Sequence, residues 1–131
     1  MIALDSSALV AILLSEPDGD LYAQALDRAD KAIITAPSAF EFLLVAHRKK
    51  GDDGVRQAQR ILASDKIAIA AWDEKLLPAA LSAVRRFGKG THKAQLNFGD
   101  CLVYAFATAG GLPLLYKSDN FAQTDVVSAL A

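Results

Sequence analysis

The chain has 131 residues, a hydrophobic fraction of 53% and a formal net charge of -1 at pH 7. This length suits one domain, residues 1–131, that can bury a core without disulfides. The nearly balanced charge excludes a protein whose overall field attracts nucleic acid, and the high apolar content favours a sheet covered on both faces. The only cysteine, Cys101, cannot form an internal disulfide, which favours a buried thiol in a reducing cytoplasm.

Short apolar stretches that predict strands alternate with stretches whose apolar residues repeat at helical spacing. The first helical stretch is apolar, but no basic residue precedes it, so we predict a core helix rather than a signal peptide or a membrane segment. In chain order, the predicted elements are strand 2–4, helix 7–15, helix 21–29, strand 32–34, helix 38–50, helix 55–62, strand 66–70, helix 76–87, helix 98–109 and strand 112–116.

Alternating strands and helices predict a parallel sheet, because the chain must cross over a face of the sheet between successive parallel strands. The predicted fold is therefore α/β, a three-layer α/β/α sandwich with a parallel sheet of four to five strands. In such sheets, ligands bind in the crevice beyond the carboxyl ends of the strands.

Four carboxylates occur where one predicted element gives way to the next. Asp5 directly follows the first strand, and Glu41 lies in the first turn of the helix after the second strand. Asp100 lies in the first turn of the apolar helix 98–109, and Asp119 follows the last strand. We expect the four acids to meet at the carboxyl edge of the sheet, where the strands of a parallel sheet end together.

Helix capping is the alternative explanation for each acid taken singly. Ser38 and Glu41 have the spacing of a capping box, and Asn97 and Asp100 have a related arrangement. Asp5 can cap the first helix, and an acid at position 119 can shape a turn. Gathered at one edge, however, four carboxylates would repel one another. No Lys or Arg lies within two residues of Asp5, Glu41 or Asp100, so a divalent cation is the expected counter-ion.

The oxygen ligands favour a hard cation, Mg²⁺ or Mn²⁺, of the kind used in phosphate chemistry. His47 and His92 lie in polar, basic stretches and are predicted to be solvated, which argues against zinc. No phosphate-binding GxxxxGK[ST] loop is present, so nucleotide hydrolysis of that type is not expected. The acids therefore predict metal-assisted phosphate chemistry, in which a bound water is activated.

The order of these motifs resembles that of PIN-domain ribonucleases, and most closely that of the VapC-type toxins of prokaryotic toxin–antitoxin pairs. The motifs are Asp5-Ser6-Ser7-Ala8-Leu9, Pro37-x-x-x-Glu41, Phe98-Gly99-Asp100-Cys101-Leu102-x-Tyr104-Ala105 and Ser118-Asp119-Asn120-Phe121-x-x-Thr124-Asp125. The resemblance implies cleavage of RNA that depends on Mg²⁺ or Mn²⁺. In-line attack by a metal-bound water would leave 5′-phosphate and 3′-hydroxyl ends. The resemblance also implies a small antitoxin that blocks the site, and a homodimer.

Carried over by position, the resemblance implies that Asp5 and Asp100 are the principal metal ligands and that Glu41 is the second acid. Many family members have an acid where this chain has Ser118. We therefore choose Asp119 as the fourth acid, with Asp125 as the reserve. Ser7 is a further candidate that would support the metal site.

RNA affinity must come from local patches, because the net charge supplies none. The candidates are Arg48, Lys49 and Lys50, and the group Arg85, Arg86, Lys89, His92 and Lys93. The alternative explanation is that these are solvated basic residues near helix ends.

Two other functions compete with the nuclease. A PIN module could bind RNA or protein without cutting, although the intact set of acids argues against it. A response-regulator receiver could use Asp73 and Lys117, but it needs paired acids after the first strand, where this chain has only Asp5. A receiver also gives Glu41 and Asp100 no function.

Overall fold

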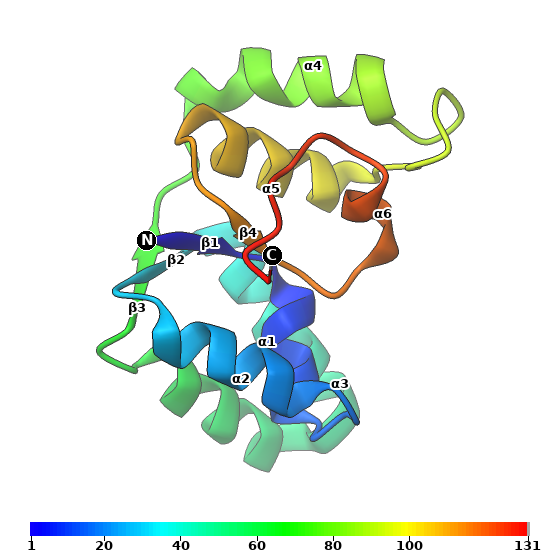
Figure 1. Cartoon of the computed structure of the whole chain (residues 1–131). Coiled ribbons are helices and arrows are strands. Elements are labelled where there is room, and N and C mark those ends of the chain that lie inside the picture. Colours follow the sequence, from blue (N-terminus) through cyan, green and yellow to red (C-terminus); the bar gives the residue numbers. More distant parts are fainter. Residues whose placement is uncertain (131) are drawn as a thin grey trace.

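The computed structural model describes residues 1–130. At its centre is a parallel four-stranded sheet in the order β3-β2-β1-β4 (Figure 1). The strands are β1 (Ile2–Leu4), β2 (Ala32–Thr35), β3 (Ile67–Ala70) and β4 (Leu114–Leu115). The parallel sheet is as predicted, although β4 is shorter than the expected strand 112–116. The N–H of Lys117, just beyond β4, donates to the Ser7 side chain rather than to a neighbouring strand.

Helices cover both faces of the sheet, which confirms the predicted three-layer sandwich (Figure 1). One layer consists of α1 (Ser6–Leu13), α2 (Gly19–Arg28) and α3 (Ala36–Leu62). The other consists of the short 3-10 helix η1 (Glu74–Leu76) with α4 (Leu77–Phe87), α5 (Phe98–Ala109) and α6 (Asp119–Ala122).

The alternation of side chains along the strands divides the core into two clusters. Ala3 and Leu114 pack with Phe87, Tyr104 and other residues of the α4–α5 layer. The next residues of the same strands, Leu4 and Leu115, belong to the cluster on the other side, which includes residues of α1 and α3. Both faces of the sheet are therefore apolar, and polar side chains can gather only where the strands end.

The predicted break after residue 50 is present as a kink inside α3. Gly51 has φ +62° and ψ -149°, a conformation that glycine adopts without the penalty that a side chain would bring. The helix resumes directly, so the two predicted helices 38–50 and 55–62 form one bent element. The half of α3 before the kink carries both Glu41 and Arg48.

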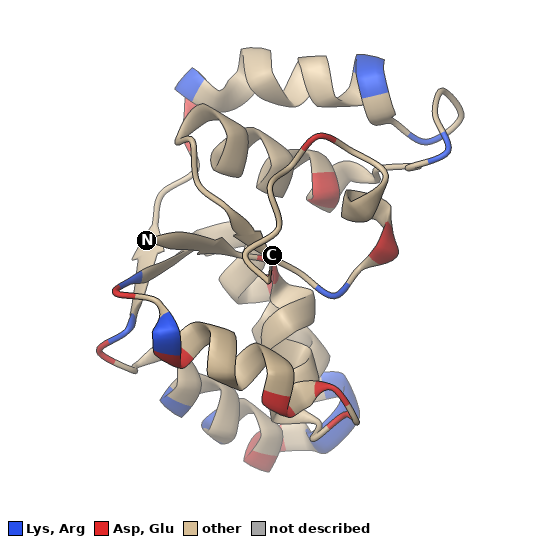
Figure 2. Ribbon diagram, viewed as in Figure 1, with Lys and Arg blue, Asp and Glu red and all other residues tan. Residues whose placement is uncertain are grey.

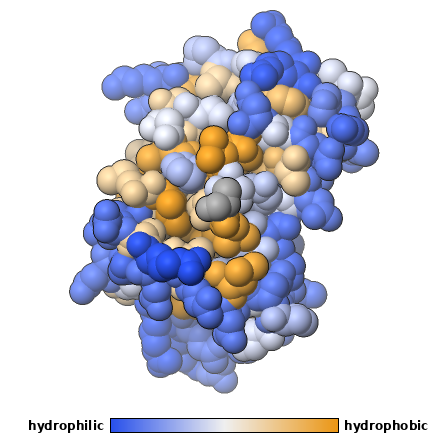
Figure 3. All heavy atoms as spheres, viewed as in Figure 1, coloured by the Kyte–Doolittle hydropathy of each residue, from blue (hydrophilic) through white to orange (hydrophobic). Residues whose placement is uncertain are grey.

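The first helix is a core helix, as predicted, because Ala8, Leu9 and Ala11 are fully buried. Within residues 1–130, no helix combines the length and apolar character that crossing a membrane requires. The C-terminal segment pairs with β4. The Leu114 N–H donates to the Val127 carbonyl, and the Leu114 carbonyl accepts from the Ala129 N–H, which forms one parallel bridge between Leu114 and Ser128. The face around this C-terminal segment is largely hydrophobic (Figure 3).

Candidate active site

Asp5 is a buried carboxylate at the junction of β1 and α1. It is the N-cap of α1 and is 5% exposed. Its Oδ2 accepts hydrogen bonds from the Ser7 N–H at 3.1 Å and from the Ser7 hydroxyl at 2.5 Å. Burial raises the pKa of Asp5 from 3.8 to about 6; the bonds from Ser7 oppose this shift, and the nearby charges of Glu41 and Asp100 add to it. The capping alternative therefore holds for Asp5, but capping leaves its charge uncompensated.

Glu41 faces α1 and does not take part in the predicted capping box. Helix α3 begins at Ala36, with Thr35 as N-cap, so Ser38 is already inside the helix, where its Oγ accepts from the Thr35 hydroxyl at 3.2 Å. The capping explanation is therefore wrong for Glu41. Its carboxylate instead accepts a hydrogen bond from the buried hydroxyl of Ser6. This contact joins the second acid to the residue that follows Asp5.

Asp100 does close a capping box at the start of α5. Asn97 Oδ1 accepts from the Asp100 N–H at 2.9 Å, and Asp100 Oδ2 accepts from the Asn97 N–H at 3.1 Å. The same carboxylate oxygen also accepts from Asn120 Nδ2 at 3.1 Å, which links α5 to α6. Asp100 therefore caps its helix while remaining close enough to Asp5 to raise the pKa of that buried acid.

Asp119 is exposed at the first position of α6 and faces the same cavity as Glu41. This cavity has a volume of about 620 Å³. Its lining is Ser6, Ser7, Val10, Glu16, Glu41, Leu44, Val45, Arg48, Lys117, Ser118 and Asp119. Figure 2 shows acidic segments in α5, in α6 and between α1 and α2, with a basic segment in the loop before α6.

The four predicted acids fit a hard divalent cation by their chemistry. They offer only carboxylate oxygens. Among residues 1–130, no Lys or Arg forms an ion pair with any of them. In the same part of the chain, however, no three His, Cys, Asp or Glu side chains converge on one point. Glu41 is engaged by Ser6, and Asp100 by Asn97 and Asn120, so these carboxylates must rotate to share an ion.

Asp125, the reserve acid, lies in a different set of contacts. Its carboxylate accepts from the Tyr104 hydroxyl at 2.6 Å and from Arg86 at 3.1 Å, and Arg86 also donates to the Tyr104 hydroxyl at 3.1 Å. Burial and the bond to Asp125 raise the pKa of Tyr104 to about 12, and that bond lowers the pKa of Asp125. These contacts tie the C-terminal segment to α4 and α5. They also occupy Arg86, one of the predicted RNA contacts.

Replacing Tyr104 by phenylalanine should lower the free energy of unfolding by about 1–2 kcal/mol, because the hydroxyl bonds a carboxylate at the edge of the core. The matched control is Tyr116→Phe, since among residues 1–130 the Tyr116 hydroxyl forms no hydrogen bond with another side chain, while its ring packs on Phe121. Urea denaturation measures both variants. Equal losses in the two variants would show that the Tyr104–Asp125 bond does not stabilise the protein.

The remaining basic candidates occupy different places. Arg48 lies two helical turns after Glu41 and lines the same cavity, whereas Lys49, Arg85, Lys89 and Lys93 are exposed outside it. Lys50 is exposed and donates to Gln57 at 2.9 Å. Of the predicted basic residues, Arg48 is thus the one that the structure brings to the acids.

The prediction for His92 is wrong, whereas His47 is exposed as expected. The His92 ring is half-buried and packs edge-on against Phe87, with 5.1 Å between ring centroids. Its Nδ1 accepts from the Ala94 N–H at 3.0 Å. His92 therefore shapes the loop between α4 and α5.

Comparisons with known proteins identify the family of this chain. A family model described as PIN domain matches residues 2–127. The chain belongs to the PIN domain family. Ribonuclease VapC from Mycolicibacterium smegmatis is 39% identical over 127 residues, which cover 97% of this chain and 98% of the relative.

Two solved structures share the fold at low sequence identity. VapC20 from Mycobacterium tuberculosis, described as a sarcin–ricin loop cleaving toxin, is 15% identical with a TM-score of 0.80, and the match covers 97% of each chain. A chain of VapBC2 from Rickettsia felis, solved bound to a DNA fragment from its promoter, is 16% identical with a TM-score of 0.78. That match covers 98% of this chain and 97% of the other.

Proposed function

We propose that this chain is a metal-dependent endoribonuclease and the toxin of a toxin–antitoxin pair. The relative named ribonuclease VapC, which aligns over almost the whole chain, supports the activity. The observation that carries the proposal is the burial of Asp5 within reach of the charges of Glu41 and Asp100, with no Lys or Arg of residues 1–130 paired to these acids. The proposed catalytic acids are Asp5, Glu41, Asp100 and Asp119.

In this proposal, Asp5 and Asp100 would hold Mg²⁺ or Mn²⁺. A bound ion of this kind lowers the pKa of water and stabilises the leaving oxygen. Glu41 and Asp119, at the cavity wall, would supply further oxygens to the ion or accept the proton of the attacking water. Ser7 donates to Asp5 Oδ2 and so fixes the direction of the other oxygen.

The structure argues against the receiver alternative, because both residues that it needs make other contacts. Asp73 caps η1, where it accepts from the Lys75 N–H at 3.0 Å. Lys117 pairs with Asp18 and Glu16 of the α1–α2 connection. Asp73 and Lys117 therefore do not pair with each other, as the phosphoacceptor site of a receiver would require. The family match is also to PIN domains. The competing function is that of a PIN module that binds without cutting. A measurement of RNA cleavage distinguishes it from the ribonuclease.

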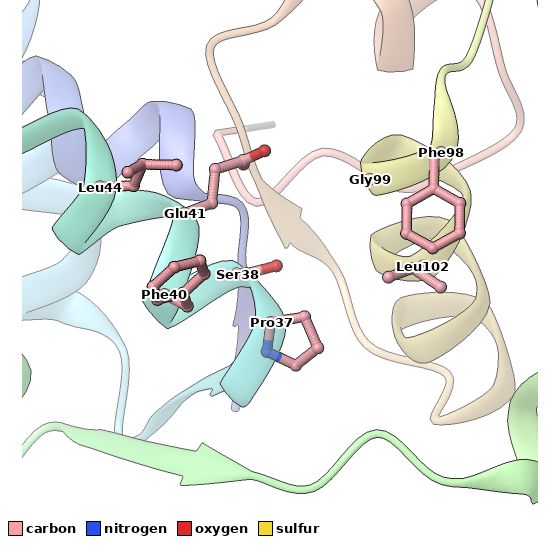
Figure 4. A pocket seen from close by; sticks show the side chains of 8 residues that line it. All are labelled: Pro37, Ser38, Phe40, Glu41, Leu44, Phe98, Gly99 and Leu102. Atoms are coloured by element: carbon pink, nitrogen blue, oxygen red, sulfur yellow. The ribbon is translucent and has the colours of Figure 1, made fainter. Parts of the chain in front are cut away.

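Protein partners are also part of the proposal. Phe40 and Phe98 are 64% and 83% exposed and border a groove of about 280 Å³ between α3 and α5. Figure 4 shows the Glu41 side chain at the mouth of this groove, between Leu44 and the residues of α5. Such exposed aromatic side chains favour a protein contact. They support a homodimer and an antitoxin partner, as does the likeness to VapBC2. The single, buried thiol of Cys101 supports a cytoplasmic location.

Cleavage of a mixed pool of tRNA and structured RNA tests the activity. We expect cleavage with Mg²⁺ or Mn²⁺, none with chelator, and 5′-phosphate and 3′-hydroxyl ends on the products. Cyclic 2′,3′-phosphate ends would contradict the chemistry, because they arise when the RNA's own hydroxyl attacks. Stable RNA binding without cleavage in either metal would favour the non-cutting module.

Replacing Arg48 by alanine should raise the KM for RNA about tenfold at low salt, because its guanidinium lies beside the acids and can contact a phosphate. The slope of log KM against log salt should fall by about one. The matched control is Arg60→Ala, an exposed arginine near the other end of α3. An unchanged KM and salt slope for Arg48→Ala would show that this residue does not contact the RNA.

A further inference from the structure

The loop between β4 and α6 delivers Asp119 to the cavity, and side chains from distant segments hold this loop. The N–H groups of Lys117 and Ser118 donate to Ser7 Oγ at 2.9 and 3.4 Å. The same Ser7 hydroxyl donates its proton to Asp5. One hydroxyl therefore links the carboxylate of the first acid to the backbone that leads to the fourth.

The side chain of Lys117 makes a second tie. Its Nζ donates to Asp18 Oδ1 at 2.9 Å and lies 3.3 Å from Glu16 Oε1, both in the connection between α1 and α2. The hydrogen bond between Lys117 and Asp18 lowers the pKa of Asp18 and raises the pKa of Lys117. Lys117 and Glu16 line the same cavity as Asp119 and Ser7. The lysine is thus anchored beside the acids, at one-third exposure.

We propose that Lys117 is a positioning residue, which fixes the β4–α6 loop through Glu16 and Asp18 so that Ser7 is held on Asp5 and Asp119 faces the cavity. This inference rests on the proposed function of the same acids. The ion pairs fix the orientation of the loop because they join it to the connection between α1 and α2. Lys117 also neutralises Glu16 and Asp18, which would otherwise add free negative charge beside Asp119.

Direct contact between Lys117 and RNA is the other role that a lysine in this cavity can have. Two acids already engage its ammonium group, which argues for the tie. The two roles differ in what they affect. A positioning residue changes how the acids bind a divalent ion when no RNA is present, whereas an RNA contact changes only the KM for RNA.

The variants that separate these roles are available in the chain. Lys117→Met keeps the aliphatic stem and removes the charge, and Lys117→Arg keeps the charge. Glu16→Gln combined with Asp18→Asn removes the acceptors. The matched control is Lys31→Met, because Lys31 also ties two segments by donating to the Asp65 carbonyl at 2.9 Å, away from the cavity.

Binding of Mn²⁺ to the RNA-free protein, followed by the electron paramagnetic resonance signal of the free ion, is the deciding measurement. We expect Lys117→Met and the Glu16→Gln/Asp18→Asn protein to bind about tenfold more weakly than the parent. Lys117→Arg and Lys31→Met should remain within about twofold of the parent. Adding Lys117→Met to the protein that lacks both acceptors should have little further effect, because the tie is already absent.

Parent-like Mn²⁺ binding by Lys117→Met would overturn the inference, and so would an equal loss in Lys31→Met. Thermal denaturation of each variant identifies a loss that merely follows unfolding, which would also count against it. Asp100→Asn separates this inference from the proposed function. If the parent binds Mn²⁺ no better than Asp100→Asn, the metal site itself fails. If only Asp100→Asn loses Mn²⁺ binding, the proposed metal site is supported and the positioning role of Lys117 is contradicted.

Discussion

Replacing Asp100 by asparagine is expected to lower the rate of RNA cleavage by about 10³-fold, which corresponds to about 4 kcal/mol in the activation free energy. Asparagine keeps an oxygen that can accept from the Asn97 N–H, so the capping box at the start of α5 can persist. What disappears is one negative charge next to Asp5. The loss of activity should therefore come without a loss of structure.

Single-turnover cleavage in Mn²⁺ measures this change, and circular dichroism and the unfolding midpoint verify the fold. Asp27→Asn is the matched control, because it removes an exposed acid of α2 outside the cavity lining. Its cleavage rate should equal that of the parent. Cleavage by Asp100→Asn at the parent's rate would show that the ligands were misassigned or that another nuclease was present.

Replacing Asp5 by asparagine should make the metal-free protein more stable while abolishing cleavage. The folded-state pKa of Asp5, about 6, exceeds the ordinary value of 3.8, so the folded protein binds this proton more tightly than the unfolded chain does. The stability that protonation brings is fully present below pH 3.8 and is lost as the pH rises through 6. At pH 8, the neutral variant should gain on the order of 3 kcal/mol over the parent.

The geometry permits this gain, because both bonds from Ser7 end on one oxygen, Oδ2, which an asparagine amide oxygen can replace. Urea denaturation of both proteins in chelator, at pH 4 and at pH 8, measures the difference. It should be close to zero at pH 4 and large at pH 8. Asp119→Asn is the control, because an exposed side chain keeps its hydration and should change stability little. An Asp5→Asn protein that is less stable than the parent at pH 8 would contradict the account.

Much of the fold could be predicted from the sequence because its signals are local. The strands are short apolar runs, and helices separate them, so the parallel sheet and its two covering layers follow. The gap between the predicted helices 38–50 and 55–62 coincides with the bend in α3, where Gly51 has a positive φ. The same locality brought Asp5 and Glu41 to attention, since each lies just beyond a strand.

The errors concern the start of one helix and the packing of one loop residue. The start of α3 at Ala36 placed Ser38 inside the helix, so the spacing with Glu41 no longer formed a capping box. Proline at position 37 is tolerated there, because the first turn of a helix needs no N–H donor. His92 was predicted to be solvated from its polar neighbours, but the ring of Phe87 offered it a packing surface.

Other residues of the site carried no signal in the sequence. Ser7 was named as a candidate and Ser6 was not, although it is Ser6 that donates to Glu41 from α1. Asn120 reaches Asp100 from α6, and only the folded chain brings these two helices together. Lys117 entered the sequence analysis only as part of a receiver, because its acceptors lie about a hundred positions earlier in the chain. Contacts of this kind are set by packing and not by spacing.

The measurement that tests the central claim most directly is cleavage of one defined RNA in Mn²⁺ by the parent and by single amide variants of the proposed acids. The variants are Asp5→Asn, Glu41→Gln, Asp100→Asn, Asp119→Asn and, for comparison, Asp125→Asn. The account predicts that the first four lose activity, that Asp125→Asn cleaves at nearly the parent's rate, and that chelator stops every reaction. Cleavage that survives chelator, or a parent-like rate for Asp5→Asn or Asp100→Asn, would contradict it.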